Sequence, residues 1–204
     1  MKFKILRTER ELINYQALTE SYIGVTFPIP YLKQGKVVGC FDDEDNLCGG
    51  FAVILNGPFR VIESIPISTE PLSTLNLHDT AEITGLWLSS NMLKKNQSLR
   101  FWLKVFFTLL FCGKKHFVYA YTLKNPKLGK IYQNGRPVVL FKGVTKILPG
   151  MKCADEESVE VIHRNNFFLT PFRHPEFLFK RFKGLRRNRH VNFENMPGMV
   201  AEKN

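Results

Sequence analysis

The stretch Ala81-Glu82-Ile83-Thr84-Gly85-Leu86-Trp87-Leu88 (AEITGLWL) decides the fold of this 204-residue chain. Its alternating apolar and β-branched residues predict a strand over 81–88. A polar connection follows over 89–97, then an apolar helix over 98–112 and a second apolar strand over 116–123 (HFVYAYTL). A strand, a helix and a strand in this order predict two parallel strands joined by a right-handed crossover.

The first helix is marked by a capping box. Thr8-Glu9-Arg10-Glu11 places a side-chain acceptor before the first turn and a glutamate at the third helical position. Apolar residues then recur at helical spacing, namely Leu12, Tyr15, Leu18 and Tyr22. We therefore expect a helix over 9–22, after a short strand over 3–6.

The clearest hairpin comes next. Two strands over 36–41 and 47–55 flank the polar turn 42–46, and a further strand is predicted over 60–65. Before the hairpin, the proline-containing stretch 26–31 predicts a loop. These strands add antiparallel neighbours to the parallel pair.

Downstream of the parallel pair, the pattern predicts a short helix over 126–133 and strands over 138–141 and 159–163. The expected fold class is therefore α/β (α+β), with a mixed, mostly antiparallel central sheet and helices on both faces. The helix over 98–112 carries apolar residues around much of its circumference, so we expect it to be buried on most sides.

Composition favours one large domain, which we place at 1–170, followed by a C-terminal segment at 171–204. Hydrophobic residues make up 44% of the chain, which excludes a disordered protein. The N-terminal residues MKFKILRTERE have no apolar core of a signal peptide, and the apolar stretch 101–112 is too short to span a bilayer. We expect a cytoplasmic protein. The cysteines and histidines lack metal-ligand spacing, so no metal is predicted.

A net charge of +11 and a pI near 9.6 favour an anionic partner. The segment 171–190 concentrates this charge, with seven basic residues against Glu176 and with interleaved phenylalanines. Such a pattern suits nucleic acid, an anionic membrane surface or an acidic carrier protein. The alternative is a docked helix whose phenylalanines pack on the core while its charges face water.

The order of elements over about 1–145 resembles the GNAT superfamily of N-acyltransferases, and AEITGLWL with the helix behind it carries the strongest local likeness. The resemblance implies an acyl donor that is a coenzyme A thioester or the phosphopantetheine of an acyl carrier protein. It also implies an amine of a small molecule as the acceptor. The strand 81–88 also looks like that of a branch containing acyl-homoserine-lactone synthases and N-acyl amino acid synthases, which take acyl chains from carrier proteins.

The resemblance assigns cofactor-binding residues around the start of the helix over 98–112. Backbone N–H groups and the helix dipole favour the donor pyrophosphate there. The residues that match this loop are Lys94, Lys95, Asn96 and Ser98. Asn96 stands where the family has a glycine, and Ser98 is expected to cap the helix. Leu86, Trp87 and Leu88 would offer backbone groups to the pantetheine arm.

A second likeness lies in YTLKNPKLGKIYQNG, where Asn125 and Tyr132 match an Asn and a Tyr of the family. The resemblance implies that Tyr132 protonates the departing thiolate. Glu82 is the candidate base that accepts the proton of the amine, directly or through water. The alternatives are a paired carboxylate for Glu82 and a packing aromatic for Tyr132.

Three functions remain open at this point. The favoured one is N-acyl transfer from acyl-CoA or acyl carrier protein to an amine. The second is a binding module without catalysis on the same fold. The third is a basic protein that binds nucleic acid or a membrane surface through 171–190.

Overall fold

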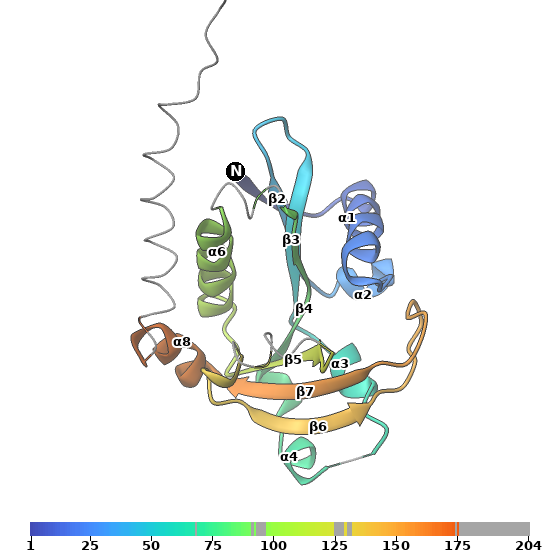
Figure 1. The fold of residues 1–204 in the computed structure, drawn as a ribbon, viewed down its shortest axis with the longest axis vertical. Coiled ribbons are helices and arrows are strands. Elements are labelled where there is room, and N and C mark those ends of the chain that lie inside the picture. Colours follow the sequence, from blue (N-terminus) through green and yellow to red (C-terminus); the bar gives the residue numbers. More distant parts are fainter. Residues whose placement is uncertain are drawn as a thin grey trace, which may run out of the picture.

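A seven-stranded mixed sheet organises the molecule (Figure 1). The computed structural model describes residues 1–67, 69–90, 92, 97–124, 129, 132–173 and 175. The sheet order is β1-β2-β3-β4-β5-β7-β6, and among these neighbours β4 and β5 are parallel while the others are antiparallel. The strands are β1 (Lys2–Leu6), β2 (Gly35–Phe41), β3 (Leu47–Ile54), β4 (Thr80–Leu88), β5 (His116–Thr122), β6 (Val138–Val144) and β7 (Glu156–His163). The predicted fold class is therefore confirmed.

Helices cover both faces of the sheet. They are α1 (Glu9–Ile23), α2 (Ile29–Leu32), α3 (Arg60–Glu63), α4 (Glu70–Ser73), the 3₁₀ turn η1 (Leu77–Asp79), α6 (Ser98–Leu110) and α8 (Arg164–Arg173). Figure 1 shows α1 and α2 on one side of β2–β4 and α6 on the other, while β5, β7 and β6 run across the lower end. The predicted capping box is present, because the Thr8 side chain accepts from the Glu11 N–H and the Glu11 carboxylate accepts from the Thr8 N–H.

The strand alternation separates the buried side chains into clusters on opposite faces. On the α6 face, Phe51 of β3 and Phe117 of β5 pack with Phe101 of α6. On the α1 face, Leu12 and Tyr15 pack with Ala52 of β3. Each fully buried large apolar side chain contributes roughly 1.5–3 kcal/mol. Both faces of the sheet are thus covered by apolar cores. Buried charged groups such as Glu82 and Glu160 are exceptions in these cores.

The parallel pair of β4 and β5 is short. Within the described strands it joins Thr80 to His116, Ala81 to Phe117 and Glu82 to Val118. Beyond these rungs β4 continues beside β3 to Leu88, and β5 continues beside β7 to the end of the strand. The two central strands therefore diverge after Glu82.

Two of the local predictions are wrong. Residues 60–65 do not form a strand, because Arg60–Glu63 is the helical turn α3. A short apolar run does not distinguish a strand from a helical turn by periodicity. The stretch predicted as a loop over 26–31 also contains a helical turn, α2, with Pro30 in its first turn.

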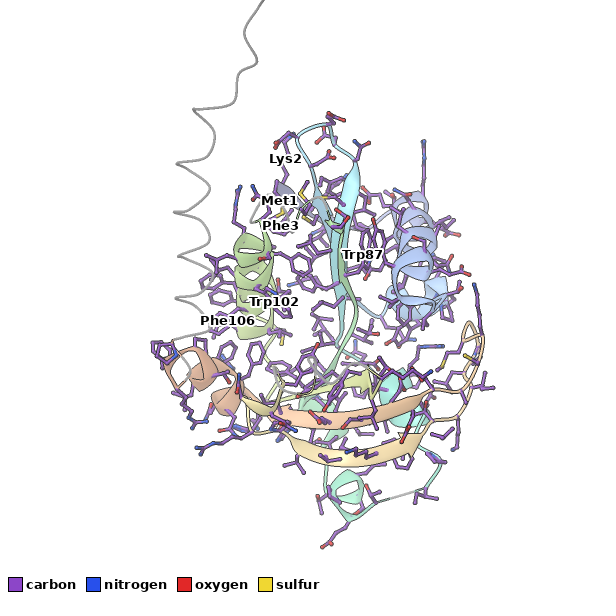
Figure 2. The ribbon with its side chains drawn as sticks, in the orientation of Figure 1. Met1, Lys2, Phe3, Trp87, Trp102 and Phe106 are labelled. Atoms are coloured by element: carbon purple, nitrogen blue, oxygen red, sulfur yellow. The ribbon has the colours of Figure 1, made fainter. Side chains whose placement is uncertain are left out.

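The predicted burial of the helix over 98–112 is wrong as well. The observed helix α6 buries one stripe, which includes Phe101, Val105 and Leu109. On its outer side Phe107 is 49% exposed, and Phe111 just beyond the helix is 76% exposed. The sheet covers only one side of α6. A second side contacts α8, because Phe106 of α6, labelled in Figure 2, stacks on Phe167 of α8.

Helix α8 crosses the predicted domain boundary at 170/171, since it extends to Arg173. The rest of the predicted basic segment, apart from residue 175, lies outside the described residues. The division into 1–170 and 171–204 remains a prediction. Among the described residues, no helix has the length and apolar character needed to cross a membrane.

Candidate active site

A bulge in β4 lies directly after the point where β4 and β5 separate. Ala52 of β3 pairs with Thr84, but Gly50 pairs with Trp87, so Gly85 and Leu86 together face one residue of β3. Gly85 has φ +59°, a left-handed conformation that favours glycine. The Tyr15 hydroxyl of α1 donates to the Gly85 carbonyl at 2.6 Å. The bulge changes the direction of the backbone where the strands diverge.

Glu82 occupies the last paired rung before the divergence and is fully buried. The Tyr31 hydroxyl donates to Oε1 at 2.6 Å, and the Val61 N–H donates to Oε2 at 3.3 Å. Burial raises the pKa of Glu82 from 4.5 to about 7, against the opposing effects of the Tyr31 and Val61 hydrogen bonds and the Arg60 charge. A carboxyl group with such a pKa changes protonation state near neutral pH.

Arg60 lies next to this carboxylate and is itself buried. Its Nη2 donates to the Pro149 carbonyl at 2.7 Å, and its guanidinium lies over the Tyr31 ring, 5.6 Å from the centroid. Tyr31 comes from the stretch 26–31 that was predicted as a loop, and it lies in α2. The hydrogen-bond partners of Glu82 thus come from α2 and α3, which the sequence analysis did not predict as helical turns.

Tyr132 belongs to a tyrosine cluster on the other face of the sheet. Its ring lies 4.8 Å from that of Tyr119 and stacks on Tyr121 at 5.2 Å. The Tyr119 and Tyr121 hydroxyls donate to the buried Glu160 at 3.0 and 2.8 Å, and Ser158 Oγ donates at 2.9 Å. Burial, and then the charge of Glu160, raises the pKa of Tyr132 to about 12. Tyr132 is therefore protonated at neutral pH.

Glu82 and Tyr132 lie on opposite faces of the sheet. Glu82 contacts Tyr31 and Val61, which belong to the α1–α3 side, whereas Tyr132 packs in the cluster that includes α6. The structure does not bring the two side chains into contact with each other. They flank the place where β4 and β5 diverge, one from each side.

The three β4 residues predicted to contact the donor point in alternate directions. Leu86 and Leu88 pack on the α6 face. Trp87 points toward α1 (Figure 2), where its Nε1 donates to Thr19 Oγ1 at 2.9 Å. Because the side chain of Trp87 packs against α1, any contact of this residue with the donor would involve its backbone.

Ser98 is the first residue of α6, and the N-cap position belongs to Gln97. The prediction that Ser98 caps the helix is therefore wrong. No side chain among the described residues caps this helix start, so its first N–H groups remain suited to an anion. Lys94, Lys95, Asn96 and Asn125 lie outside the described residues.

Sequence reasoning missed Glu160 and its tyrosines. A signal was available, because Glu160 stands inside the apolar run 159–162 (VEVI) of a predicted strand. A charged residue in such a run is rarely buried without partners. Tyr31 carried no comparable signal, since its role depends on how α2 folds back against β4.

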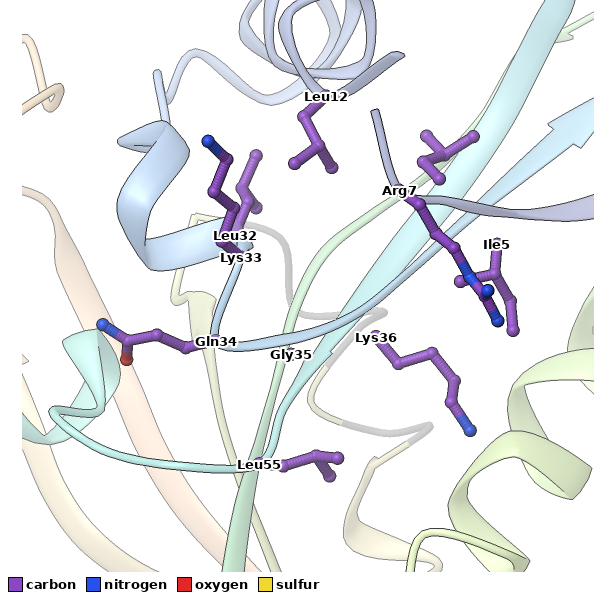
Figure 3. A pocket seen from close by; sticks show the side chains of 10 residues that line it. Ile5, Arg7, Leu12, Leu32, Lys33, Gln34, Gly35, Lys36 and Leu55 are labelled. Atoms are coloured by element: carbon purple, nitrogen blue, oxygen red, sulfur yellow. The ribbon is translucent and has the colours of Figure 1, made fainter. Parts of the chain in front are cut away.

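A surface hollow elsewhere in the molecule is lined in part by Ile5 and Leu55 and by the basic residues Arg7 and Lys36 (Figure 3). It lies at β1 and the start of β2, and neither Glu82 nor Tyr132 lines it. No group of three His, Cys, Asp or Glu residues in the described part of the chain is placed to hold a metal ion.

No protein-family model and no curated protein sequence matches the chain. Solved structures do match. An N-acyl amino acid synthase from uncultured soil microbes is 12% identical, with a TM-score of 0.53 over 81% of this chain and 92% of that protein. A dodecameric spermidine N-acetyltransferase from Vibrio cholerae is 11% identical, with a TM-score of 0.52 over 81% of this chain and 95% of that protein.

A third match is a putative acetyltransferase from Salmonella typhimurium with its cofactor acetyl-CoA. It is 8% identical, with a TM-score of 0.50 over 80% of this chain and 94% of that protein. At these identities the likeness concerns the fold, and it confirms that this chain has the GNAT fold. The synthase and the spermidine enzyme match almost equally well, so the likeness to the synthase branch remains a prediction.

Proposed function

We propose that this protein is an N-acyltransferase that moves an acyl group from a coenzyme A thioester to the amine of a small molecule. The observation that carries the proposal is the divergence of β4 and β5 directly after Glu82, with a buried carboxyl group on one face and Tyr132 on the other. Fold alone does not define function. The proposal therefore rests on the chemistry that these two groups support.

The reaction forms one bond and breaks another. The amine nitrogen attacks the thioester carbonyl, the C–N bond forms, and the C–S bond breaks. The amine loses one proton, and the thiolate gains one. This chemistry needs a base, a polarised carbonyl and an acid.

Glu82 is the proposed base. A group whose pKa lies near the working pH combines an available anion with useful basicity, and burial places the pKa of Glu82 at about 7. Because the carboxylate is fully buried, we propose that it accepts the proton through a water molecule. The hydrogen bond from the Tyr31 hydroxyl to Oε1 fixes the orientation of the Glu82 carboxyl group.

Tyr132 is the proposed acid. It is protonated at neutral pH, and the neighbouring rings of Tyr119 and Tyr121 restrict its position. Its proton would go to the departing thiolate. The two roles are compatible with opposite faces, because the amine and the donor would approach the separated strands from opposite sides.

The donor phosphates are proposed to lie at the start of α6. Among the described residues no side chain caps this helix start, and this, with Ser98 in the first turn, supports the placement. Lys94, Lys95, Asn96 and Asn125 remain the proposed donor contacts from sequence. Leu86, Trp87 and Leu88 contribute through the backbone of β4.

An acyl carrier protein is the alternative donor, and the basic segment 171–190 would be its docking site. Deletion of 176–204 separates the two donors. The deletion should raise KM for an acyl carrier protein thioester and leave KM for the matching acyl-CoA unchanged. An equal effect on both donors would remove the docking role from this segment.

The proposal is tested by free-thiol release with short- and long-chain acyl-CoA and acyl-carrier-protein thioesters. The amines should include spermidine and a set of amino acids, because neighbours with this fold are named for such acceptors. Release above the protein-free rate that requires an amine would support N-acyl transfer. Donor binding without release would favour a non-catalytic binding module. If the protein neither binds a donor nor releases thiol, both the transferase and the binding module are excluded.

A further inference from the structure

The contact between Tyr15 and the β4 bulge is more than packing of a helix on a sheet. Tyr15 is fully buried in α1, and its hydroxyl reaches across to the carbonyl of Gly85. A carbonyl in a regular strand points along the sheet toward a neighbouring strand. The carbonyl of Gly85 instead accepts from a helix that covers one face, so this peptide is turned out of the plane of the sheet.

The other end of the same peptide is the N–H of Leu86. The peptide is trans, since the cis bond among the described residues is Gly57–Pro58. In a planar trans peptide the carbonyl and the N–H point in opposite directions. Because the carbonyl points to α1, the Leu86 N–H points toward the α6 face, where Tyr132 lies.

The surrounding residues are adapted to Tyr15. A Cβ on Gly85 would collide with the Tyr15 hydroxyl, and a Cβ on Gly50 would meet the Tyr15 ring at 2.6 Å. The ring therefore fits against two positions without side chains, one on each strand beside the bulge. This fit holds the hydroxyl in one place, and the hydroxyl in turn holds the turned peptide.

We propose that Tyr15 is a positioning residue for acyl transfer: its hydroxyl keeps the Gly85–Leu86 peptide turned so that the Leu86 N–H donates to the thioester carbonyl of the donor. The proposal rests on the proposed function. It adds a role in catalysis for a residue of α1, which covers the face of the sheet opposite α6 (Figure 1). A fixed N–H stabilises the negative charge that develops on the carbonyl oxygen, and its effect depends on its exact direction.

The first experiment compares Tyr15→Phe with a matched control in the full-length protein. Tyr15→Phe keeps the ring that fits against Gly50 and removes only the hydroxyl. Gln16→Leu is the control, because Gln16 Nε2 also donates from α1 to a backbone carbonyl, in this case that of Phe27. Both variants lose one side-chain-to-backbone hydrogen bond.

We expect Tyr15→Phe to lower kcat with acetyl-CoA at least about tenfold while KM for acetyl-CoA changes less than about twofold, since the lost interaction acts mainly in the transition state. Gln16→Leu should leave both constants near wild type. Equal kinetics in the two variants would overturn the role of Tyr15. An inactive wild type that binds no acetyl-CoA would instead refute the proposed function, and this inference with it.

A second measurement uses the wild type and does not depend on folding of the variant. Binding of acetonyl-CoA, a ketone analogue that is not cleaved, should slow hydrogen exchange of the Leu86 amide in NMR spectra. The amide of Val37 on β2, which β3 separates from β4, should not change. If acetonyl-CoA binds and the Leu86 amide exchanges as before, the proposed direction of this N–H is wrong.

Discussion

Glu82 and Glu160 are both buried carboxylates of the central sheet, but they lie on opposite faces and have different partners. Glu82 accepts one hydroxyl and one long backbone N–H bond, and its pKa is raised to about 7. Glu160 accepts three hydroxyls, from Tyr119, Tyr121 and Ser158. Glu82 lies where β4 and β5 diverge, whereas Glu160 orders the tyrosines that surround Tyr132. Burial of a carboxylate does not by itself identify a base.

The largest expected effect is that of Glu82→Gln, which preserves shape and removes the proton acceptor. The rate constant kcat/KM should fall by about 10²–10⁴-fold, the usual contribution of a general base. In the wild type the rate should rise with pH through about 7, because the base must lose its proton. The pH profile of thiol release between pH 5 and 9 measures both effects.

The matched control for this substitution is Glu157→Gln. Glu157 is a partly buried carboxylate whose pKa is also raised by burial, but it bonds Thr145 away from the divergence of β4 and β5. It should retain the wild-type profile. A Glu82→Gln variant with the wild-type rate would leave Glu82 as a structural carboxylate.

The same substitution should change how stability depends on pH. Since the folded-state pKa of Glu82 is raised, the folded protein binds the proton more tightly than the unfolded chain. The stability from this group is complete below about pH 4.5 and is lost as pH rises through about 7, by roughly 3 kcal/mol. Urea unfolding at pH 5 and pH 8 should show a smaller loss for Glu82→Gln than for the wild type. Equal losses would contradict the raised pKa.

Tyr132→Phe should have the next largest effect, a decrease in kcat of about 10²-fold, because the thiolate would leave without its acid. Rapid-quench measurement of the first turnover isolates this step from product release. Tyr22→Phe is a suitable control, since Tyr22 stacks on Trp87 on the other face and Phe keeps the stack. An unchanged first turnover would reduce Tyr132 to a packing aromatic.

Glu160→Gln tests whether the second carboxylate acts through Tyr132. The charge of Glu160 raises the pKa of Tyr132, so its removal should lower that pKa. Ultraviolet titration of tyrosinate, compared with the double variant that also carries Tyr132→Phe, measures the change. We expect about tenfold lower activity and a loss of about 1–3 kcal/mol in stability from imperfectly satisfied hydroxyls. A drop as large as that of Glu82→Gln would end the distinction between the two carboxylates.

The elements with strong local signals could be predicted from sequence. The capping box at Thr8 and Glu11 gave the start of α1, and the order strand, helix, strand gave the parallel pair. Glu82 was identified from the likeness of its strand to a known fold. The sequence-based prediction placed Glu82 on this strand but contained nothing about its partners.

The partners could not be predicted because tertiary packing defines them. Tyr31 and Arg60 reach Glu82 from single helical turns, α2 and α3, which are too short to show a helical period. Tyr15 looked like one more apolar residue of α1, yet its hydroxyl bonds a carbonyl 70 positions away. Such contacts depend on which faces of the sheet the helices cover, and no local pattern encodes that.

The smallest expected effect is that of Tyr31→Phe, and it separates the two faces most directly. The Tyr31 hydrogen bond lowers the pKa of Glu82, so its loss should raise that pKa and move the midpoint of the pH–rate profile upward. Activity should fall severalfold at pH 6 and approach the wild-type value at pH 9, where the carboxylate is ionised in both proteins. Tyr121→Phe removes an equivalent tyrosine–carboxylate bond to Glu160 on the opposite face, and it should leave the midpoint in place. A midpoint that moves equally in both variants would mean that the profile does not report Glu82, and the assignment of the base would fall with it.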